Sequence, residues 1–310
     1  MDIANIALLI MSCVVVLANG VVCGLVATRR KLRTFTNGFV VSLAISDILS
    51  GGVFMPTSVL VPGSRVNNHV SMVVIVSSTL NLSAVAFERY LAVVKPLSYK
   101  MVIKHWFRRL VGLVWGVAIF MSVLPAFWDA NVESLIHKVY LSCAVILFLV
   151  LPLVFILFVY TFIFIKLRQH GKLLHNLHAT RTRLAEARRS KRESKTVKIF
   201  FSIMALFAFC WIPVMYMTFT VVANRLDLIP PYLMLVSHVS IMLSSLINPF
   251  LYTFMKQDFR REATSLFCKK LVQRRESSKR GIDENSETQV VYTKAPLVTI
   301  HNDTDSENRV

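Results

Sequence analysis

Long uncharged apolar runs, separated by short charged stretches, make up most of the chain. Seven segments of 19 to 31 residues contain no Asp, Glu, Lys or Arg apart from Asp47 in the second of them: Ile3–Thr28, Thr34–Ser64, Val66–Phe87, Leu110–Trp128, Val139–Ile165, Ile199–Asn224 and Leu228–Met255. A helix that rises 1.5 Å per residue needs about 20 apolar residues to cross the ~30 Å hydrocarbon core of a bilayer. The pattern therefore predicts an all-α membrane protein with seven transmembrane helices.

The composition excludes a disordered chain and argues against an ordinary soluble domain. Hydrophobic residues make up 55% of the 310 and charged residues 17%, against about 45 to 50% and about 25% in soluble proteins. The net charge of +18 could suggest nucleic-acid binding. Such proteins spread their basic residues over a polar surface, whereas here these residues lie between apolar runs. We therefore expect no nucleic-acid partner.

The basic residues gather in alternate connections. Four follow the first segment, five lie between Lys95 and Arg109 after the third, eleven lie between the fifth and sixth, and eleven follow the seventh. The remaining connections hold one each: Arg65, Lys138 and Arg225. Because loop Lys and Arg stay cytoplasmic, we expect an extracellular N-terminus and a cytoplasmic C-terminus. Only two residues precede the first segment, so we expect it to act as a signal anchor without a cleavable signal peptide.

The end of the chain is polar and lacks the apolar density to fold. The predicted division is a membrane domain over residues 1–272 and a disordered cytoplasmic tail over residues 273–310. Four cysteines fall in the apolar segments and Cys268 falls near the tail. We therefore expect no extracellular disulfide.

Asp47 is the only acid within the seven segments. A carboxylate near the bilayer midplane costs roughly 2.5 to 3.5 kcal/mol, so it needs partners. Polar residues at comparable depth are Asn19, Ser78, Ser244, Ser245 and Asn248. The cluster is either a structural hydrogen-bond network or a site for a hard monovalent cation or a proton. We predict a sodium-sensitive allosteric site at Asp47, Ser78, Ser245 and Asn248, and no other cofactor.

Short motifs in these segments resemble those of rhodopsin-like (class A) G-protein-coupled receptors. In chain order they are Ser42–Asp47, Glu88-Arg89-Tyr90, Trp115, Pro152, Tyr160, Phe207 with Cys210–Pro213, and Asn248–Tyr252. The resemblance extends from Asn19 to about Cys268. It implies a seven-helix bundle with a short amphipathic eighth helix, and a plasma-membrane receptor, not an enzyme, that binds an extracellular ligand and activates a heterotrimeric G protein.

The resemblance also implies individual roles. Arg89 is held in the resting state by Glu88 and by Glu193 at the base of the sixth segment, which moves outward on activation, and Leu97 docks into the G protein. The residues implied in coupling and switching are Glu88, Arg89, Tyr90, Leu97, Tyr160, Glu193, Phe207, Trp211, Pro213, Asn248, Pro249 and Tyr252. Cys268 is a candidate for palmitoylation. Arrestin and receptor kinases, acting on the tail, and membrane lipids are further expected partners.

The chain departs from the family between the second and third segments. Only 41 residues separate Asp47 from Arg89, and Ser64 stands where the family has a cysteine. Either the first outer loop is naturally short or a stretch of sequence is missing. Ser71 replaces the aspartate of amine receptors, and Met242 the lysine of opsins. The remaining ligand-binding candidates suit a small neutral molecule, a lipid or a peptide end: Ser71, Ile75, Tyr140, Met215, Thr218 and His238.

Three other classes of membrane protein are alternatives to a signalling receptor. An intramembrane enzyme needs paired carboxylates or a metal cluster, and the segments contain only Asp47. A transporter usually shows repeated halves and broken helices, and the sequence shows neither. A receptor that binds ligand without signalling is the remaining alternative, against which the Glu88-Arg89-Tyr90 motif argues.

Overall fold

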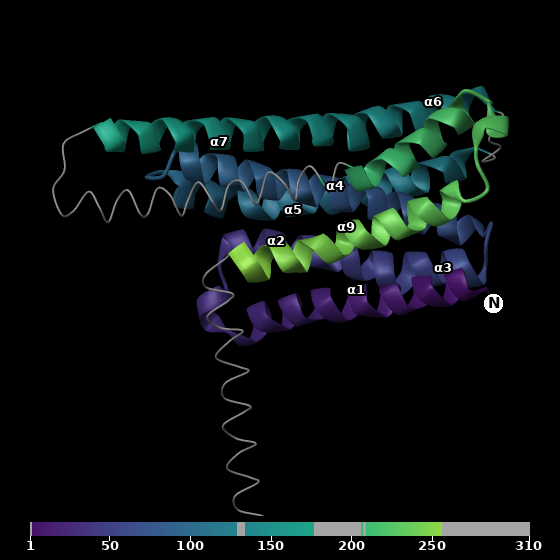
Figure 1. Ribbon diagram of the computed structural model, residues 1–310, viewed down its shortest axis with the longest axis horizontal. Coiled ribbons are helices and arrows are strands. Elements are labelled where there is room, and N and C mark those ends of the chain that lie inside the picture. Colours follow the sequence, from purple (N-terminus) through teal and green to yellow (C-terminus); the bar gives the residue numbers. More distant parts are fainter. Residues whose placement is uncertain (1, 129–133, 177–205, 207–208, 256–310) are drawn as a thin grey trace, which may run out of the picture. The chain divides into compact units, whose positions relative to one another are not determined.

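The computed structural model describes residues 2–128, 134–176, 206 and 209–255. All of these belong to one compact unit, Met1–Arg260, in which long helices lie side by side (Figure 1). The predicted tail, residues 273–310, and the predicted eighth helix lie outside the described residues, so the division of the chain at residue 272 stays a prediction.

The described elements are all helical. In chain order they are α1 (Ile3–Thr28), η1 (Arg30–Leu32), α2 (Phe35–Leu49), η2 (Ser50–Phe54), α3 (Met55–Leu60), α4 (Arg65–Val94), α5 (Tyr99–Val123), η3 (Leu124–Phe127), α6 (Leu135–Val145), η4 (Ile146–Val150), α7 (Leu151–Asn176), η5 (Leu226–Leu228) and α9 (Leu233–Met255). A further helix covers Phe209–Val222. Of the short elements, η2 and η4 are π-helical turns within longer helices, and η1, η3 and η5 are 3-10 turns. The predicted all-α class is confirmed.

Membrane-length helices account for six of the predicted segments. The helices Ile3–Thr28, Phe35–Leu60, Arg65–Val94, Tyr99–Phe127, Leu135–Lys166 and Leu233–Phe250 are long and apolar enough to span a bilayer. The shorter apolar helix Phe209–Val222 lies within the sixth predicted segment, whose first part is outside the described residues. Within the bundle α1 contacts α2 and α9, and α4 contacts α2, α5 and α7, so α4 is central.

The helices extend beyond the uncharged runs that predicted them. α4 continues past Phe87 to Val94, and α5 begins at Tyr99, well before Leu110. Charged residues such as Lys and Arg are good helix formers, so a helix need not end where the hydrocarbon ends. α9 begins at Leu233 instead of Leu228, because Pro230 and Pro231 precede it. Proline has no backbone N–H to donate, so it is not accommodated in the interior of a helix. The apolar pattern therefore marks membrane depth, not helix ends.

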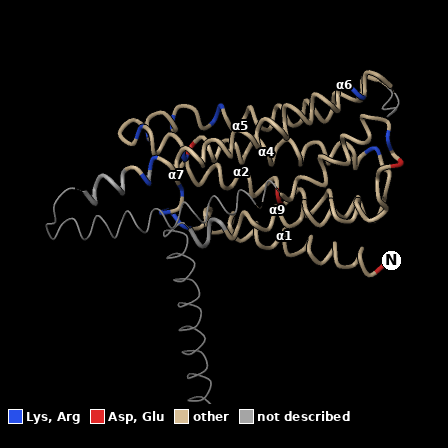
Figure 2. Tube along the Cα trace, turned by 45° about the horizontal axis from the view of Figure 1, so that its top comes forward, with Lys and Arg blue, Asp and Glu red and all other residues tan. Residues whose placement is uncertain are grey.

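The bundle is apolar on its outside and partly polar inside. α1 exposes Ile6, Ile10 and Leu17 and buries Ser12 and Asn19. Such a helix suits a lipid environment, in which the exposure of aliphatic side chains carries no free-energy penalty. Lys and Arg lie mainly near the ends of the helices (Figure 2).

Local capping fixes the start of three helices. The side-chain oxygens of Thr34, Ser64 and Ser134 accept hydrogen bonds from backbone N–H groups in the first turns of α2, α4 and α6. Such caps satisfy N–H groups that have no partner within the helix. Ser64, which stands where the resembled family has a cysteine, is thus the residue that caps α4.

Glycine is required where α1 meets the second span. A Cβ atom on Gly51 would lie 2.9 Å from the backbone oxygen of Ser12, whereas one on Gly52 would lie 3.6 Å from its nearest neighbour, a methyl group of Val16. The Ser12 hydroxyl donates a hydrogen bond to the Gly51 carbonyl. Gly51 therefore allows a backbone approach that a larger residue would block.

Hydrogen bonds hold the beginning of α4, the end that the orientation predicted from the sequence places outside the cell. The Asn67 side-chain oxygen accepts from the hydroxyls of Thr57 (3.1 Å) and Ser58 (2.8 Å). The Ser122 hydroxyl donates to the His69 carbonyl (2.9 Å), and the His69 ring contacts the Ser122 carbonyl (2.5 Å). We call these five residues the outer clamp. It ties α4 to α3 and α5 without a disulfide, and the described cysteines are all free thiols.

Candidate functional site

Arg89 and Glu88 lie near the end of α4, at what we call the basic end of the bundle, where α1 and α4 end and α2 and α5 begin. The Glu88 side chain is almost completely buried, at 2% exposure, and Arg89 Nε lies 3.3 Å from Glu88 Oε2. The Nε–H is not aligned for a hydrogen bond, so the attraction between the two groups is electrostatic. The structure thus brings together the first two residues of the predicted switch.

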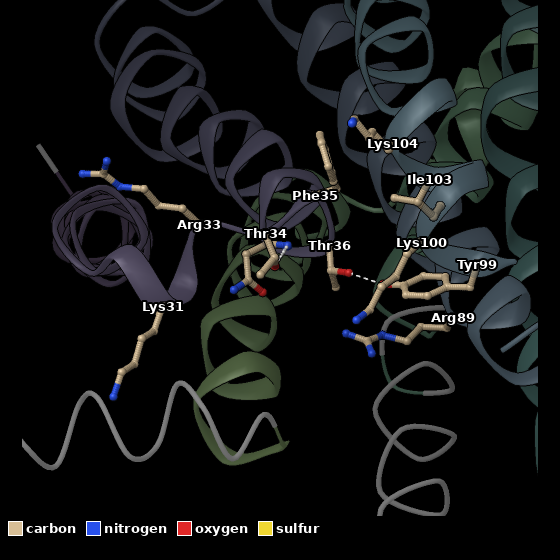
Figure 3. Close-up of a pocket in the computed structure, with 11 residues that line it drawn as sticks. Lys31, Arg33, Thr34, Phe35, Thr36, Arg89, Tyr99, Lys100, Ile103 and Lys104 are labelled. Carbon is tan, nitrogen blue, oxygen red and sulfur yellow. Dashed lines mark hydrogen bonds between the residues drawn. The ribbon is translucent and has the colours of Figure 1, made fainter. Parts of the chain in front are cut away.

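The second oxygen of Glu88 accepts two hydrogen bonds. Tyr99 Oη donates to Glu88 Oε1 over 2.7 Å, and Thr36 Oγ1 donates to the same oxygen over 2.8 Å. The two hydroxyl oxygens lie 2.5 Å apart, and Figure 3 shows Thr36 and Tyr99 directed toward one another. We call Thr36, Glu88, Arg89 and Tyr99 the Glu88 network. It joins the first turn of α2 and the first residue of α5 to the end of α4.

Asp47 is buried where α1, α2 and α9 meet, with 1% of its surface exposed. Asn248 Nδ2 donates to Asp47 Oδ2 over 2.9 Å, and the Ser245 hydroxyl also hydrogen-bonds the carboxylate. Asn19 Nδ2 donates to the Ser245 carbonyl over 3.3 Å. Three of the polar residues predicted near Asp47 are therefore linked to it directly or through one neighbour.

Three buried side-chain oxygens on the second, third and seventh spans make no hydrogen bond within the described part of the chain. They are Ser50 Oγ, Ser78 Oγ and Asn248 Oδ1. A buried oxygen without a donor is costly unless another group approaches it. Oxygen atoms around a carboxylate are also the donor type that hard cations prefer. Ser78 and Asn248 were predicted, whereas Ser50 was not, although its position three residues after Asp47 is a signal that helical spacing could have supplied.

A separate polar network holds the second, third and fourth spans together. Trp115 Nε1 donates to Ser42 Oγ over 3.0 Å, and Asn81 Nδ2 donates to Ser46 Oγ over 3.0 Å. All of its members are on the motifs that carried the family resemblance or face them. Because these bonds join groups on neighbouring spans, we assign them a structural role, although Asn81 Oδ1 accepts no hydrogen bond from the described residues.

The other predicted switch residues are distributed along the bundle. Tyr160, Trp211 and Pro249 are buried, and Pro213 is half-buried. The Tyr90 ring packs against the Phe162 ring, with 5.5 Å between the ring centroids. Leu97 is 97% exposed in the short connection between α4 and α5. Tyr252 lies on α9, but its side chain is outside the described residues, as are Glu193, Phe207 and Cys268.

The predicted ligand-binding residues lie on four helices. Ser71 and Ile75 are on α4, Tyr140 is on α6, Met215 and Thr218 are on the helix Phe209–Val222, and His238 is on α9.

Their polar contacts are local. Ser71 and Thr218 donate to carbonyls of their own helices, and Tyr140 donates to the Met121 carbonyl over 2.7 Å. The His238 ring packs near the Phe54 ring at 5.8 Å. Within the described part of the chain, these hydrogen bonds do not join the candidates to one another. The ligand pocket therefore stays a prediction.

Comparison with known proteins gives one family and many relatives. The family described as "7 transmembrane receptor (rhodopsin family)" matches residues 18–252, from within α1 to within α9. Neuromedin-U receptor 1 of Homo sapiens is 27% identical over 81% of this chain and 69% of its own length. The histamine H2 receptor of Homo sapiens is 27% identical over 87% and 80%. The adenosine receptor A2b of Gallus gallus is 26% identical over 94% and 96%.

Proposed function

The chain belongs to the rhodopsin family of seven-transmembrane receptors, and on this premise we propose that an extracellular ligand drives it to activate a heterotrimeric G protein by outward movement of its sixth transmembrane helix. The family makes it a multi-pass plasma-membrane receptor that couples to G proteins, and not an enzyme. The seven-helix bundle and the family resemblance predicted from the sequence are confirmed. A transporter is set aside by the same finding.

The proposed orientation places the basic end in the cytoplasm. The connections at that end carry Arg29, Arg30, Lys31 and Arg33 after α1, and Lys95 after α4. The opposite end carries Arg65 and Lys138 near helix starts, and Arg225 beside Asp227. This asymmetry supports an extracellular N-terminus by the positive-inside rule.

The Glu88 network is the observation that carries the proposed switch. A buried carboxylate that holds Arg89 beside it and accepts two hydroxyl donors stabilises one arrangement of α2, α4 and α5. Such a contact is worth a few kcal/mol, an amount that differential ligand binding can overcome. We propose that this arrangement is the resting state and that Arg89 leaves Glu88 on activation. Glu193 is proposed as the second acid of the lock.

Leu97 and the tail supply the remaining proposed contacts. Leu97 is almost fully exposed at the proposed cytoplasmic end, and an exposed apolar anchor suits a protein partner. We propose that it docks into the G protein. The tail is the proposed site of arrestin and receptor-kinase action, and Cys268 the proposed site of palmitoylation.

The Asp47 site is proposed to bind sodium. A buried carboxylate with two hydrogen-bond donors offers the charge that a small monovalent cation needs, and the buried oxygens of Ser50, Ser78 and Asn248, which have no donor among the described residues, are candidate ligand atoms. Sodium bound there would neutralise Asp47 and link the second, third and seventh spans. We expect it to stabilise the resting bundle.

The identity of the ligand is proposed only by class. The relatives named above are receptors for neuromedin U, histamine and adenosine, at almost equal identity. Overall similarity therefore does not select one ligand chemistry. Ser71, a neutral residue that donates to its own helix, supports a small neutral molecule, a lipid or a peptide end over a cationic amine.

Signalling can be tested in cells that express the full chain with an N-terminal epitope tag. Dissociation sensors for each class of Gα subunit would be read at rest and against a panel of neutral, lipid and peptide ligands, with Arg89→Ala as the matched variant. We expect activation of at least one class by the wild type and its loss in the variant at equal surface level. Specific ligand binding at the surface without activation of any Gα class would favour the non-signalling alternative.

A further inference from the structure

A pocket of about 610 Å³ opens at the basic end of the bundle, between the start of α2 and the start of α5 (Figure 3). Its lining includes four cationic residues, Lys31, Arg33, Lys100 and Lys104, and also Arg89. No Asp or Glu is among its described lining residues. The Glu88 carboxylate accepts hydrogen bonds from the hydroxyls of Thr36 and Tyr99, and these two residues line the pocket.

The four cations lack acidic partners within the described residues. Lys31, Lys100 and Lys104 are exposed, and no described carboxylate lies at ion-pair distance from them. The guanidinium of Arg33 donates to the Ala27 carbonyl, which leaves its charge uncompensated. Like charges gathered around one concavity repel each other and attract an anion.

Two helix N-termini add to this positive potential. α2 has 15 residues and begins at Phe35, and α5 has 25 residues and begins at Tyr99. Both first residues line the pocket. The N-terminus of a helix carries a partial positive charge and N–H groups that favour phosphate. The pocket therefore combines two helix dipoles with four side-chain charges.

The position and size of the pocket indicate the source of the anion. Phe35, in the lining, and Trp106, on the same helix as Lys104, are both partly exposed aromatic residues, and such residues prefer the head-group region of a bilayer. The volume is within the roughly 300 to 1,000 Å³ of small-molecule sites. A phosphomonoester carries about −1.5 to −2 charges, so several phosphates on one group are needed to balance four cations.

We propose that this pocket binds the polyphosphorylated head group of an inner-leaflet lipid, a phosphoinositide. Basic pockets at the cytoplasmic side of membrane helices suit such head groups. The inference rests on the proposed cytoplasmic orientation of the basic end. Because Arg89 belongs both to the lining and to the Glu88 network, the bound head group lies against the proposed switch.

The test uses the purified full chain in phosphatidylcholine nanodiscs with increasing amounts of phosphatidylinositol 4,5-bisphosphate, and measures bound lipid by native mass spectrometry. The test variant is Lys31→Gln with Lys104→Gln. The matched control is Arg30→Gln with Arg109→Gln, which removes two charges from the same loop and the same helix outside the lining. Lys31→Arg with Lys104→Arg keeps the charges, and thermal unfolding of each variant reports folding.

We expect about 30-fold weaker binding in the test variant, from about 1 kcal/mol per cation. The control and the charge-keeping variant should bind like the wild type, and soluble inositol 1,4,5-trisphosphate should compete. Equal losses in the test and control variants, or equal binding of phosphatidylserine, would overturn the proposal in favour of general surface attraction. Equal competition by inorganic phosphate would reduce the site to a single-phosphate site, and stronger competition by the receptor's own acidic tail peptide would make the tail the occupant. None of these outcomes depends on G-protein activation, which is tested separately.

Discussion

Removing one hydroxyl from the Glu88 network should raise basal signalling. Tyr99→Phe deletes the 2.7 Å hydrogen bond to Glu88 Oε1 and keeps the aromatic ring. A hydrogen bond to a charged group contributes about 1.5 to 3 kcal/mol. Thr36 still donates to the same oxygen over 2.8 Å, so the lower value applies. If the bond exists only in the resting state, the equilibrium between resting and active receptor shifts by about tenfold.

The assay is ligand-independent dissociation of the coupled Gα subunit, measured across a range of receptor amounts and plotted against surface level. Tyr216→Phe is the matched control, because it removes a hydroxyl that donates to the Leu228 carbonyl over 3.0 Å at the opposite end of the bundle. We expect Tyr99→Phe to give a basal signal several times that of the wild type, and the control to give a basal signal equal to that of the wild type. An unchanged or lower basal signal at equal surface level would show that the network is not a resting-state contact.

Three further changes test other parts of the structure. Asp47→Asn should abolish the rise in melting temperature that sodium chloride, compared with choline chloride, gives the purified receptor; a rise equal to that of the wild type would remove sodium from this site. Asn67→Ala breaks two bonds of the outer clamp and should lower stability by about 1 to 2 kcal/mol, while dithiothreitol should leave the melting temperature of the wild type unchanged; the opposite pair of results would mean that a disulfide, not the clamp, holds α4. Gly51→Ala should lower both surface level and melting temperature, because its Cβ atom meets the Ser12 carbonyl, whereas Gly52→Ala should be neutral; equal behaviour of the two would contradict the close approach.

The membrane spans were predictable because one physical requirement, an apolar surface about 30 Å long, acts on every residue of a span. The helix ends were not. α5 begins at Tyr99 and carries Lys100 and Lys104 on its first turns, and a pattern based on apolar runs treats those residues as a loop. The pocket at the basic end, which these turns help to form, could not be predicted from the sequence for the same reason.

The partners of buried charges were predictable only in part. Depth in the membrane placed Asn248 and Ser245 beside Asp47, because residues at equal depth on packed helices can meet. Depth gave no such guidance for Glu88, whose hydroxyl donors Thr36 and Tyr99 come from loop-proximal positions 52 and 11 residues away. Helical periodicity identifies a face but not the neighbour that covers it. The partners of Glu88 could therefore be identified only from the packed structure.

The π-helical turn η2 divides the second span into two parts that follow different registers. A π-helical turn holds one residue more than an α-helical turn, and one residue rotates an α-helix by about 100°. The part before the turn directs Asp47 into the bundle, and the part after it directs Ser58 to Asn67. Deleting one residue within Ser50–Phe54 would restore a continuous α-helix and turn Ser58 away from Asn67 while Asp47 stayed in place. The π-helical turn η2 therefore sets the direction of Ser58 relative to Asp47.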